Sequence, residues 1–221
     1  MLQITQHQII VPSEQELAKL KEVFFTHHCV VLVQLLGPAL RDLMLEKLES
    51  AQFYSKSHKD CQAQEFASDL TVRENEGALH LIHFVLNNPK FIETIREITG
   101  CTAIASFAGR IYRNLPAENH QLDWHSDTDQ PERLLGLSIN LSNQPYQGGI
   151  FQLRKKNSGE INCEVACDRP GDAHLFLISP KLQHRVTRLE GNSSRTSAAG
   201  WFFSAPDRVT VLRTLSSKSA Q

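Results

Sequence analysis

The stretch Trp124-His125-Ser126-Asp127 guides the interpretation of the rest of the chain. His125 and Asp127 are two residues apart, so in extended backbone their side chains leave the same face. A neutral imidazole beside a carboxylate suits a divalent transition metal. A lone His-x-Asp triplet is also common in solvated loops, so the pair needs a third ligand. His184 is the best candidate for it.

Two His and one carboxylate on one side of a metal leave the opposite positions open. That arrangement is the facial triad of non-haem Fe(II) oxygenases. Arg195 follows His184 along the chain, and Ser197 comes two residues later. An Arg side chain can hold a carboxylate through two parallel hydrogen bonds, and Ser197 can add a third. We therefore expect a metal centre next to a place for an anionic co-substrate.

Several further motifs stand in a fixed order around these residues. They are Ile111-Tyr112-Arg113, His125-Ser126-Asp127, Gly148-Gly149, Pro170-Gly171-Asp172, His184-Arg185-Val186 and Arg195-Thr196-Ser197. From about Arg110 to Phe203 the chain thereby resembles 2-oxoglutarate- and Fe(II)-dependent dioxygenases of the prolyl-4-hydroxylase-like branch. It departs from their usual pattern at Ile150, where an acidic residue commonly follows the glycines, and at Leu122, where an aromatic often precedes the first His.

The resemblance implies roles for the catalytic residues. His125, Asp127 and His184 would hold Fe(II), and Arg195 would hold the distal carboxylate of 2-oxoglutarate. O2 would be the second co-substrate, with succinate and CO2 as products. Hydroxylation of an unactivated C–H bond is the expected outcome, although desaturation or ring closure uses the same chemistry. Related halogenases lack the carboxylate ligand, so Asp127 argues against halogenation.

Two further residues, Asn140 and Tyr112, are candidates for binding the co-substrate. In the expected strand Leu134–Leu141, Ser138 and Asn140 point away from the apolar residues, which suggests a wet pocket on that face. Tyr112 lies on the strand before the triad and could donate its hydroxyl to 2-oxoglutarate. The alternative for Tyr112 is a core aromatic with a satisfied hydroxyl group.

Composition limits the class of protein. The chain has 221 residues, 41% of them hydrophobic, which is enough for one large domain. A net charge of -1 gives no basic field for nucleic acid or an anionic membrane. No apolar run reaches transmembrane length. The five Cys are scattered behind no signal peptide, so we expect free thiols and a cytoplasmic location. Cys163 and Cys167 lack the second thiol pair of a structural zinc site.

Local patterns predict an α+β, mainly β domain over residues 1–221, with a helical part (1–100) and a jelly-roll core (101–210). The core would be a cupin-like double-stranded β-helix with the helices packed outside one sheet. Helices are expected from a Ser13 capping box to His27–His28, from Ala39 to about Phe53, over Ala78–Leu86 and from Pro89 to Thr99. Before the core, Val30–Leu35 reads as a buried strand. The core strands expected are Ala103–Phe107, Arg110–Asn114, Leu134–Leu141, Ile150–Arg154, Ile161–Ala166, Ala173–Ile178, His184–Leu189 and Arg195–Ser204.

Two connections carry further expectations. Residues 55–77 are polar and poorly periodic, which predicts a connection without regular structure, either a lid over the substrate or a surface loop. Gly191-Asn192 marks a turn, so His184 and Arg195 are expected on adjacent strands of one hairpin.

The substrate is less constrained than the chemistry. The small chain favours a small molecule, such as an amino acid or a biosynthetic intermediate. A peptidyl, prolyl-like residue on a protein is the alternative that the branch resemblance supports. Two other hypotheses are a cupin-like metal enzyme that does not use 2-oxoglutarate and a non-catalytic sensor on the same fold. The first would leave Arg195 without an anionic partner, and the second would keep the fold but show no turnover of the co-substrate.

Overall fold

The computed structural model describes residues 1–59, 65–74, 76–116, 120, 122–167 and 169–204. The N-terminal part combines helices with short strands: β1 (Gln3–Ile4), β2 (Ile9–Ile10), α1 (Glu14–His27), β3 (Cys29–Leu32), α2 (Pro38–Glu49), β4 (Phe53–Lys59), β5 (Glu65–Val72), α3 (Gly77–Leu86) and α4 (Pro89–Thr99). The part that follows is built of strands: β6 (Ser106–Asn114), β7 (Leu122–His125), β8 (Arg133–Asn140), β9 (Gln147–Gly148), β10 (Phe151–Lys155), β11 (Ile161–Val165), β12 (Ala173–Leu177), β13 (Leu182–Val186), β14 (Leu189–Glu190) and β15 (Arg195–Phe203).

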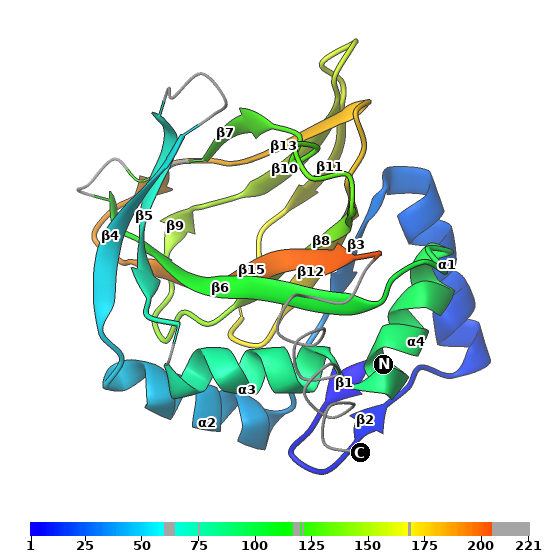
Figure 1. The fold of residues 1–221 in the computed structure, drawn as a ribbon, viewed down its shortest axis with the longest axis horizontal. Coiled ribbons are helices and arrows are strands. Elements are labelled where there is room, and N and C mark those ends of the chain that lie inside the picture. Colours follow the sequence, from blue (N-terminus) through cyan, green and yellow to red (C-terminus); the bar gives the residue numbers. More distant parts are fainter. Residues whose placement is uncertain (60–64, 75, 117–119, 121, 168, 205–221) are drawn as a thin grey trace, which may run out of the picture.

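One antiparallel sheet of 11 strands folds over on itself to make a jelly roll, as the sequence predicts. Its order is β11-β10-β13-β7-β5-β6-β15-β8-β12-β3, with β4 paired to β5. The strands β11, β10, β13 and β7 form a smaller layer above the larger layer of β6, β15, β8, β12 and β3 (Figure 1). Strand β5 joins the two layers, because it pairs with β7 at Ala67 and with β6 at Leu70 and Thr71.

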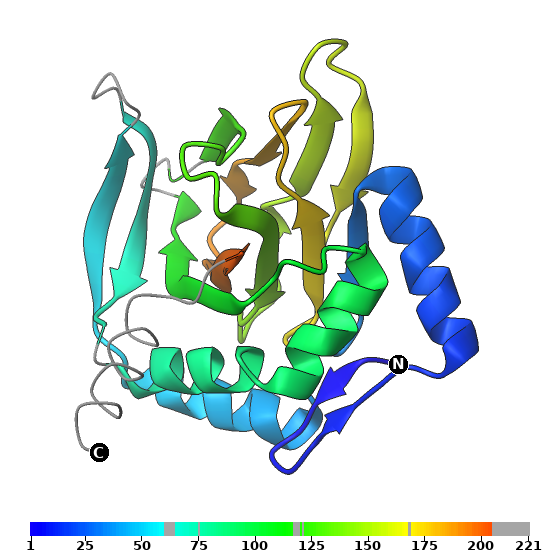
Figure 2. The same ribbon diagram turned by 45° about the vertical axis from the view of Figure 1, so that its right-hand side comes forward.

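Strand alternation assigns the two faces of the larger layer. In β8, Leu135, Leu137 and Ile139 are fully buried against the helices, while Ser138 and Asn140 face the space between the layers. Helices α2, α3 and α4 lie along the outer face of this layer (Figure 2). The ring of Phe91 in α4 packs 6.3 Å from that of Phe202 in β15. The polar interior face is therefore free to form a site.

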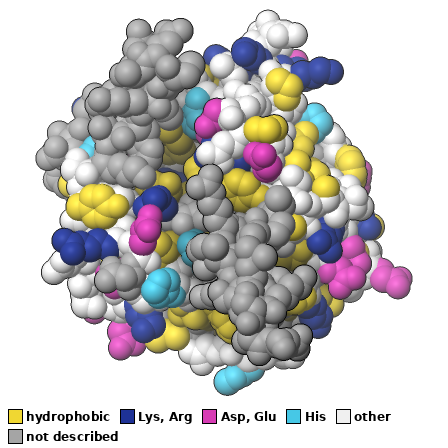
Figure 3. Space-filling view, viewed as in Figure 1, with side chains coloured by type: hydrophobic (Ala, Val, Ile, Leu, Met, Phe, Trp, Pro, Cys, Tyr) yellow, Lys and Arg dark blue, Asp and Glu magenta, His cyan; other side chains and the backbone are white. Residues whose placement is uncertain are grey.

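The helix boundaries confirm the capping signals. Ser13 and Glu16 form the predicted capping box at the start of α1. Asn88 caps α4, which ends at Gly100 with a left-handed backbone (φ 71°). None of the helices in the described ranges is long and apolar enough to cross a bilayer. Acidic and basic side chains both occur across the face shown in Figure 3.

The expectation of an unstructured connection at 55–77 is wrong. Apart from residues 60–64 and 75, which lie outside the described ranges, this segment contains most of the β4–β5 hairpin and the start of α3. The strands could not be recognised from this polar sequence. Strand β5 is stabilised by pairing with the distant β6 and β7 rather than by a local apolar pattern. The N-terminal part is accordingly not purely helical, and β3 within it forms the edge of the larger layer.

The predicted hairpin of His184 and Arg195 is also wrong. Strand β13 pairs with β10 and β7, whereas β15 pairs with β6 and β8, so the two residues lie in opposite layers. Gly191 does make a turn (φ 72°), but the chain crosses from one layer to the other there. A turn signal reports a reversal of the chain and does not identify the strand partner. The two strands expected between Ala103 and Asn114 are one strand, β6.

Candidate active site

Three potential metal ligands meet at the mouth of the jelly roll. His125 ends β7 and lies directly opposite His184 of β13 in the strand register. Asp127 Oδ2 is 3.3 Å from His184 Nε2, and Asp127 Oδ1 is 3.7 Å from His125 Nε2. The ligand atoms of all three residues lie within 4.8 Å of one another. Two imidazoles and a carboxylate this close can hold a divalent transition metal from one side.

The backbone brings Asp127 to the site in an unexpected way. Extended backbone was expected from His125 to Asp127, but β7 stops at His125 and Asp127 adopts a left-handed conformation (φ 55°). The carboxylate therefore turns toward the imidazoles instead of projecting in parallel with them. Such a conformation is uncommon for a residue other than glycine and is often found where function requires it.

Electrostatics favour the metal-binding protonation states of His125 and Asp127. Burial, followed by the influence of His184, lowers the pKa of His125 to about 4. Burial alone would raise the pKa of Asp127, but the hydrogen bond and charge of His184, with contributions from His125 and Trp201, keep that pKa below its ordinary value. At neutral pH His125 is thus neutral and Asp127 ionised, which are the states that bind a metal.

A second group of side chains fixes Asp127 from behind. Trp201 donates its indole N–H to Asp127 Oδ2 at 2.7 Å. The guanidinium of Arg133 lies 3.8 Å from the centre of the Trp201 ring and 3.7 Å from Asp127 Oδ1. Arg133 also pairs with Asp129 at 2.9 Å. Hydrogen bonds of this kind orient a metal-binding carboxylate.

Arg195 lies on the interior face of β15, in the layer opposite His184. Its side chain donates from Nη1 to Ser197 Oγ (3.3 Å) and from Nη2 to Ser138 Oγ (3.5 Å). The residue is buried, and its Nε has no hydrogen-bond partner among the described residues. None of the ion pairs formed within the described part of the chain involves Arg195. A buried guanidinium bonded only to hydroxyl groups is costly unless an anion joins it, so the arrangement fits a carboxylate ligand.

The other predicted co-substrate residues lie on strands next to Arg195, but Asn140 already makes hydrogen bonds within the protein. Ser197 is buried and pairs in register with Tyr112 on one side and Asn140 on the other. Burial, followed by the charge of Asp69, raises the pKa of Tyr112, which keeps its phenol protonated. The amide of Asn140 is already engaged, because it donates to the carbonyl of Cys167 (2.7 Å) and accepts from the backbone N–H of Ser142 (2.9 Å).

The segment that contains these site residues also matches a known protein family. Residues 110–203 match the family model described as the 2OG-Fe(II) oxygenase superfamily. Over this segment the chain is therefore similar to that superfamily. Its members use Fe(II), 2-oxoglutarate and O2, so the segment is the core of a 2-oxoglutarate-dependent oxidoreductase. No curated protein matches the chain.

Solved structures share the fold of this oxygenase core at low sequence identity. One is an oxidoreductase of the 2OG-Fe(II) oxygenase family from Burkholderia pseudomallei (TM-score 0.67, 14% identity, 93% of this chain and 97% of that chain). Another is a Pseudomonas putida prolyl-4-hydroxylase (0.59, 16%, 86% and 100%). A third is a prolyl hydroxylase from Trichoplax adhaerens in complex with a hypoxia inducible factor oxygen degradation domain peptide fragment (0.63, 13%, 87% and 94%).

Sequence reasoning gave no site role to His174, which lies near enough to Arg195 and His184 to be affected by the charge of each. His174 is buried beside Ser138 on the interior face of β12. Its Nδ1 lies 3.5 Å from the Sγ of Cys167. Burial, then the neighbouring Arg195 and His184, lowers its pKa to about 3. The alternation of Ala173, His174 and Leu175 along an apolar strand is the sequence signal that could have placed this imidazole on the interior face.

Proposed function

We propose that this chain is an Fe(II)- and 2-oxoglutarate-dependent oxygenase that hydroxylates an unactivated C–H bond of a small molecule, releasing succinate and CO2. An amino acid or a biosynthetic intermediate is the proposed substrate class. The observation that carries the proposal is the unpaired, buried Nε of Arg195 in the layer facing the His125, Asp127 and His184 triad. In this proposal a metal site and an anion site share one interior.

Each group of residues has a distinct task in this proposal. His125, Asp127 and His184 would hold Fe(II), which when bound supplies the chemistry that couples decarboxylation of 2-oxoglutarate to oxidation of the substrate. Arg195 would hold the distal carboxylate of 2-oxoglutarate through charge-assisted hydrogen bonds. Ser197 and the protonated hydroxyl of Tyr112 would add neutral contacts to it. Asn140 is left out of this set, because backbone groups already occupy its amide.

The three triad side chains are largely buried, which favours a substrate small enough to reach them. The side chains of His125, Asp127 and His184 are only 17%, 13% and 7% exposed. A compact molecule can approach such a site completely, and water is largely kept from the ligands. The fold likeness to prolyl hydroxylases, one of them with a bound peptide fragment, makes a peptidyl, prolyl-like residue the second candidate.

Metal and co-substrate binding can be tested separately. His184→Ala leaves two ligands and should abolish stoichiometric binding of Fe(II), or of Co(II) as a stable substitute, in a calorimetric titration. His80→Ala, at an exposed position on α3, should bind metal as the wild type does. Retention of stoichiometric metal by His184→Ala would refute the ligand assignment.

Arg195→Ala should bind metal normally but need more 2-oxoglutarate. Loss of a charge-assisted pair is worth about 1.5–3 kcal/mol, so the half-saturating concentration should rise roughly 10- to 100-fold. Arg154→Ala, on the outside of the smaller layer, is the matched control. An unchanged 2-oxoglutarate requirement in Arg195→Ala would favour a metal enzyme or sensor that does not use 2-oxoglutarate.

The two substrate classes can be distinguished by succinate release. Free amino acids and other small acids are compared with short proline-containing peptides at equal concentration. Stimulation by the small molecules alone supports the first candidate, and stimulation by the peptides alone supports the second.

A further inference from the structure

Two thiols meet where the open edges of the two layers come together. Strand β3 ends the larger layer and β11 ends the smaller one. Cys29 of β3 is 1% exposed, and Cys163 of β11 is partly exposed. The two thiols lie close enough across this edge that each shifts the pKa of the other. Both side chains pack into one apolar cluster between the layers, together with Phe151 and Phe176.

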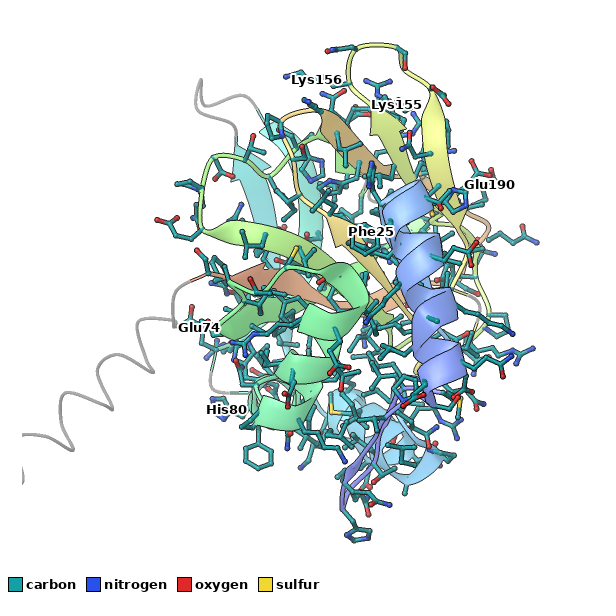
Figure 4. The ribbon with its side chains drawn as sticks, turned by 90° about the vertical axis from the view of Figure 1, so that its right-hand side faces the viewer. Phe25, Glu74, His80, Lys155, Lys156 and Glu190 are labelled. Atoms are coloured by element: carbon teal, nitrogen blue, oxygen red, sulfur yellow. The ribbon has the colours of Figure 1, made fainter. Side chains whose placement is uncertain are left out.

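Two hydrogen bonds hold the chain segments that carry the thiols. Nδ1 of His27, two residues before Cys29, lies 3.2 Å from the carbonyl oxygen of Asn162, the residue before Cys163. The carbonyl of His28 accepts from the N–H of Leu177 at 2.9 Å. Figure 4 shows α1 on this side of the molecule, and Lys155 and Lys156 mark the tip of the β10–β11 hairpin. The contact is therefore a built junction between the end of α1 and β11.

The thiols also stand at the ends of two rows of residues that lead to the triad. In the smaller layer, Cys163 pairs with Leu153, which pairs with His184, which pairs with His125.

In the larger layer, Cys29 pairs with Phe176, which pairs with Gly136, which pairs with Trp201. Trp201 in turn donates its hydrogen bond to Asp127. A bond between the two thiols would join the far ends of both rows and close the sandwich on the side opposite to β5.

We propose that Cys29 and Cys163 form an oxidation site, which a hydroperoxide converts to an intramolecular disulfide that clasps the two layers. The Cys163 thiolate attacks the peroxide oxygen, the O–O bond breaks, and Cys163 becomes a sulfenic acid while hydroxide leaves and takes up a proton. The Cys29 sulfur then attacks the Cys163 sulfur, and the sulfenic oxygen leaves as water with the Cys29 proton. In total, two thiols and one H2O2 give one disulfide and two waters.

The surroundings of the two thiols favour this division of roles. The interaction with Cys29 lowers the pKa of Cys163, whereas the same interaction and then burial raise the pKa of Cys29. The thiolate is the nucleophile toward peroxide, and Cys163 is the more accessible of the pair. Cys29 is buried next to it, where it can resolve the sulfenic acid.

Peptide mapping of the oxidised protein tests the disulfide directly. The purified full chain is treated with a small excess of H2O2, blocked with N-ethylmaleimide and cleaved after glutamate without reduction. Cleavage at Glu22, Glu46, Glu160 and Glu164 places Cys29 in peptide 23–46 and Cys163 in peptide 161–164, apart from Cys167. We expect these two peptides to be joined, with a mass lower than their sum by two hydrogen atoms, and to separate with dithiothreitol.

Two variants and a thermal scan complete the test. Cys163→Ser should abolish the cross-link, whereas Cys101→Ser, at a thiol outside the junction, should leave it intact. The oxidised wild type should unfold at a higher temperature than the reduced protein, by on the order of 5 °C, and return on reduction. A cross-link to the Cys167 peptide, a disulfide between two chains, irreversible oxygen addition to Cys163, or an unchanged unfolding temperature would overturn the proposal.

Discussion

Asp127 is the residue on which the contacts of the site converge. It approaches both imidazoles, accepts from Trp201, and lies near Arg133. Its left-handed backbone conformation is costly for a β-carbon-bearing residue, so these contacts must hold it in place. The orientation of the carboxylate therefore depends on side chains that do not themselves contact a metal.

Trp201→Phe should weaken metal binding while the fold is retained. Phenylalanine keeps the ring that packs on Arg133 but removes the N–H that Asp127 Oδ2 accepts. Loss of such an orienting hydrogen bond typically costs about 10- to 100-fold in metal affinity, measurable by Co(II) calorimetry. Trp124→Phe is the matched control, since Trp124 packs against Arg154 and Arg185 outside the smaller layer. Equal Co(II) affinity in both variants would show that Trp201 does not position Asp127.

At the residue scale, the metal ligands could be predicted from the sequence, whereas the side chains that contact them could not. The spacing of His125 and Asp127 predicted a pair, the family resemblance added His184 as the third ligand, and the structure does bring the three together. Trp201 and Arg133 were not assigned to Asp127, because their contacts depend on which strands pair. His174 was missed for the same reason: its nearness to Arg195 follows from the place of β12 beside β8.

At the scale of elements, the paired strands β6 and β15 approach each other very closely at Gly200. A Cβ built on Gly200 would lie 2.3 Å from the carbonyl oxygen of Ala108 and 2.4 Å from Cα of Gly109. Both are backbone atoms of the paired strand, so no side-chain rotation can relieve the clash.

Gly200→Ala should therefore destabilise the protein by about 2–3 kcal/mol in urea unfolding, because β6 and β15 must separate to accept the methyl group. Gly77→Ala is the control. Its Cβ would meet only the end of Lys47, at 4.0 Å, in the first turn of α3. That substitution should be neutral or stabilise by up to about 1 kcal/mol. Equal stability of the two variants would contradict the role given to the β6–β15 contact.

The elements that local chemistry specifies were predictable, and those specified by distant partners were not. The Ser13 capping box acts within a few residues and forms as predicted, and α4 spans Pro89–Thr99 as predicted. Strands β4 and β5 were missed because the polar stretch from residue 55 onward becomes a sheet only through pairing with β6 and β7. The His184 and Arg195 hairpin failed because neighbouring strands in sequence enter opposite layers of a jelly roll.

At the scale of the whole molecule, His174 links stability to pH. Its folded-state pKa of about 3 lies below the ordinary 6.5, so the folded protein binds this proton less readily than the unfolded chain. The resulting stability is complete above pH 6.5 and is lost as the pH falls from 6.5 toward 3. At about pH 5 the loss from this group alone should be about 2 kcal/mol.

His174→Gln should flatten that acid dependence. Between about pH 7 and pH 5 the variant should lose about 2 kcal/mol less free energy of unfolding than the wild type, as measured by urea unfolding at each pH. His80→Gln, at an exposed position, should follow the wild-type curve. Parallel curves for the wild type and His174→Gln would contradict the neutral, buried state of His174.

The layers of the jelly roll divide the proposed chemistry between them. The smaller layer carries His125 and His184, and the larger layer carries Arg195, so folding itself would assemble the proposed metal site and the proposed anion site. The most direct measurement is an oxygen-free titration of the apoprotein with Fe(II) and then 2-oxoglutarate, followed by visible absorbance. A keto acid that chelates Fe(II) beside Arg195 predicts a charge-transfer band that iron alone does not give and that Arg195→Ala weakens strongly at the same 2-oxoglutarate concentration. Iron binding without any such band would contradict 2-oxoglutarate as the co-substrate.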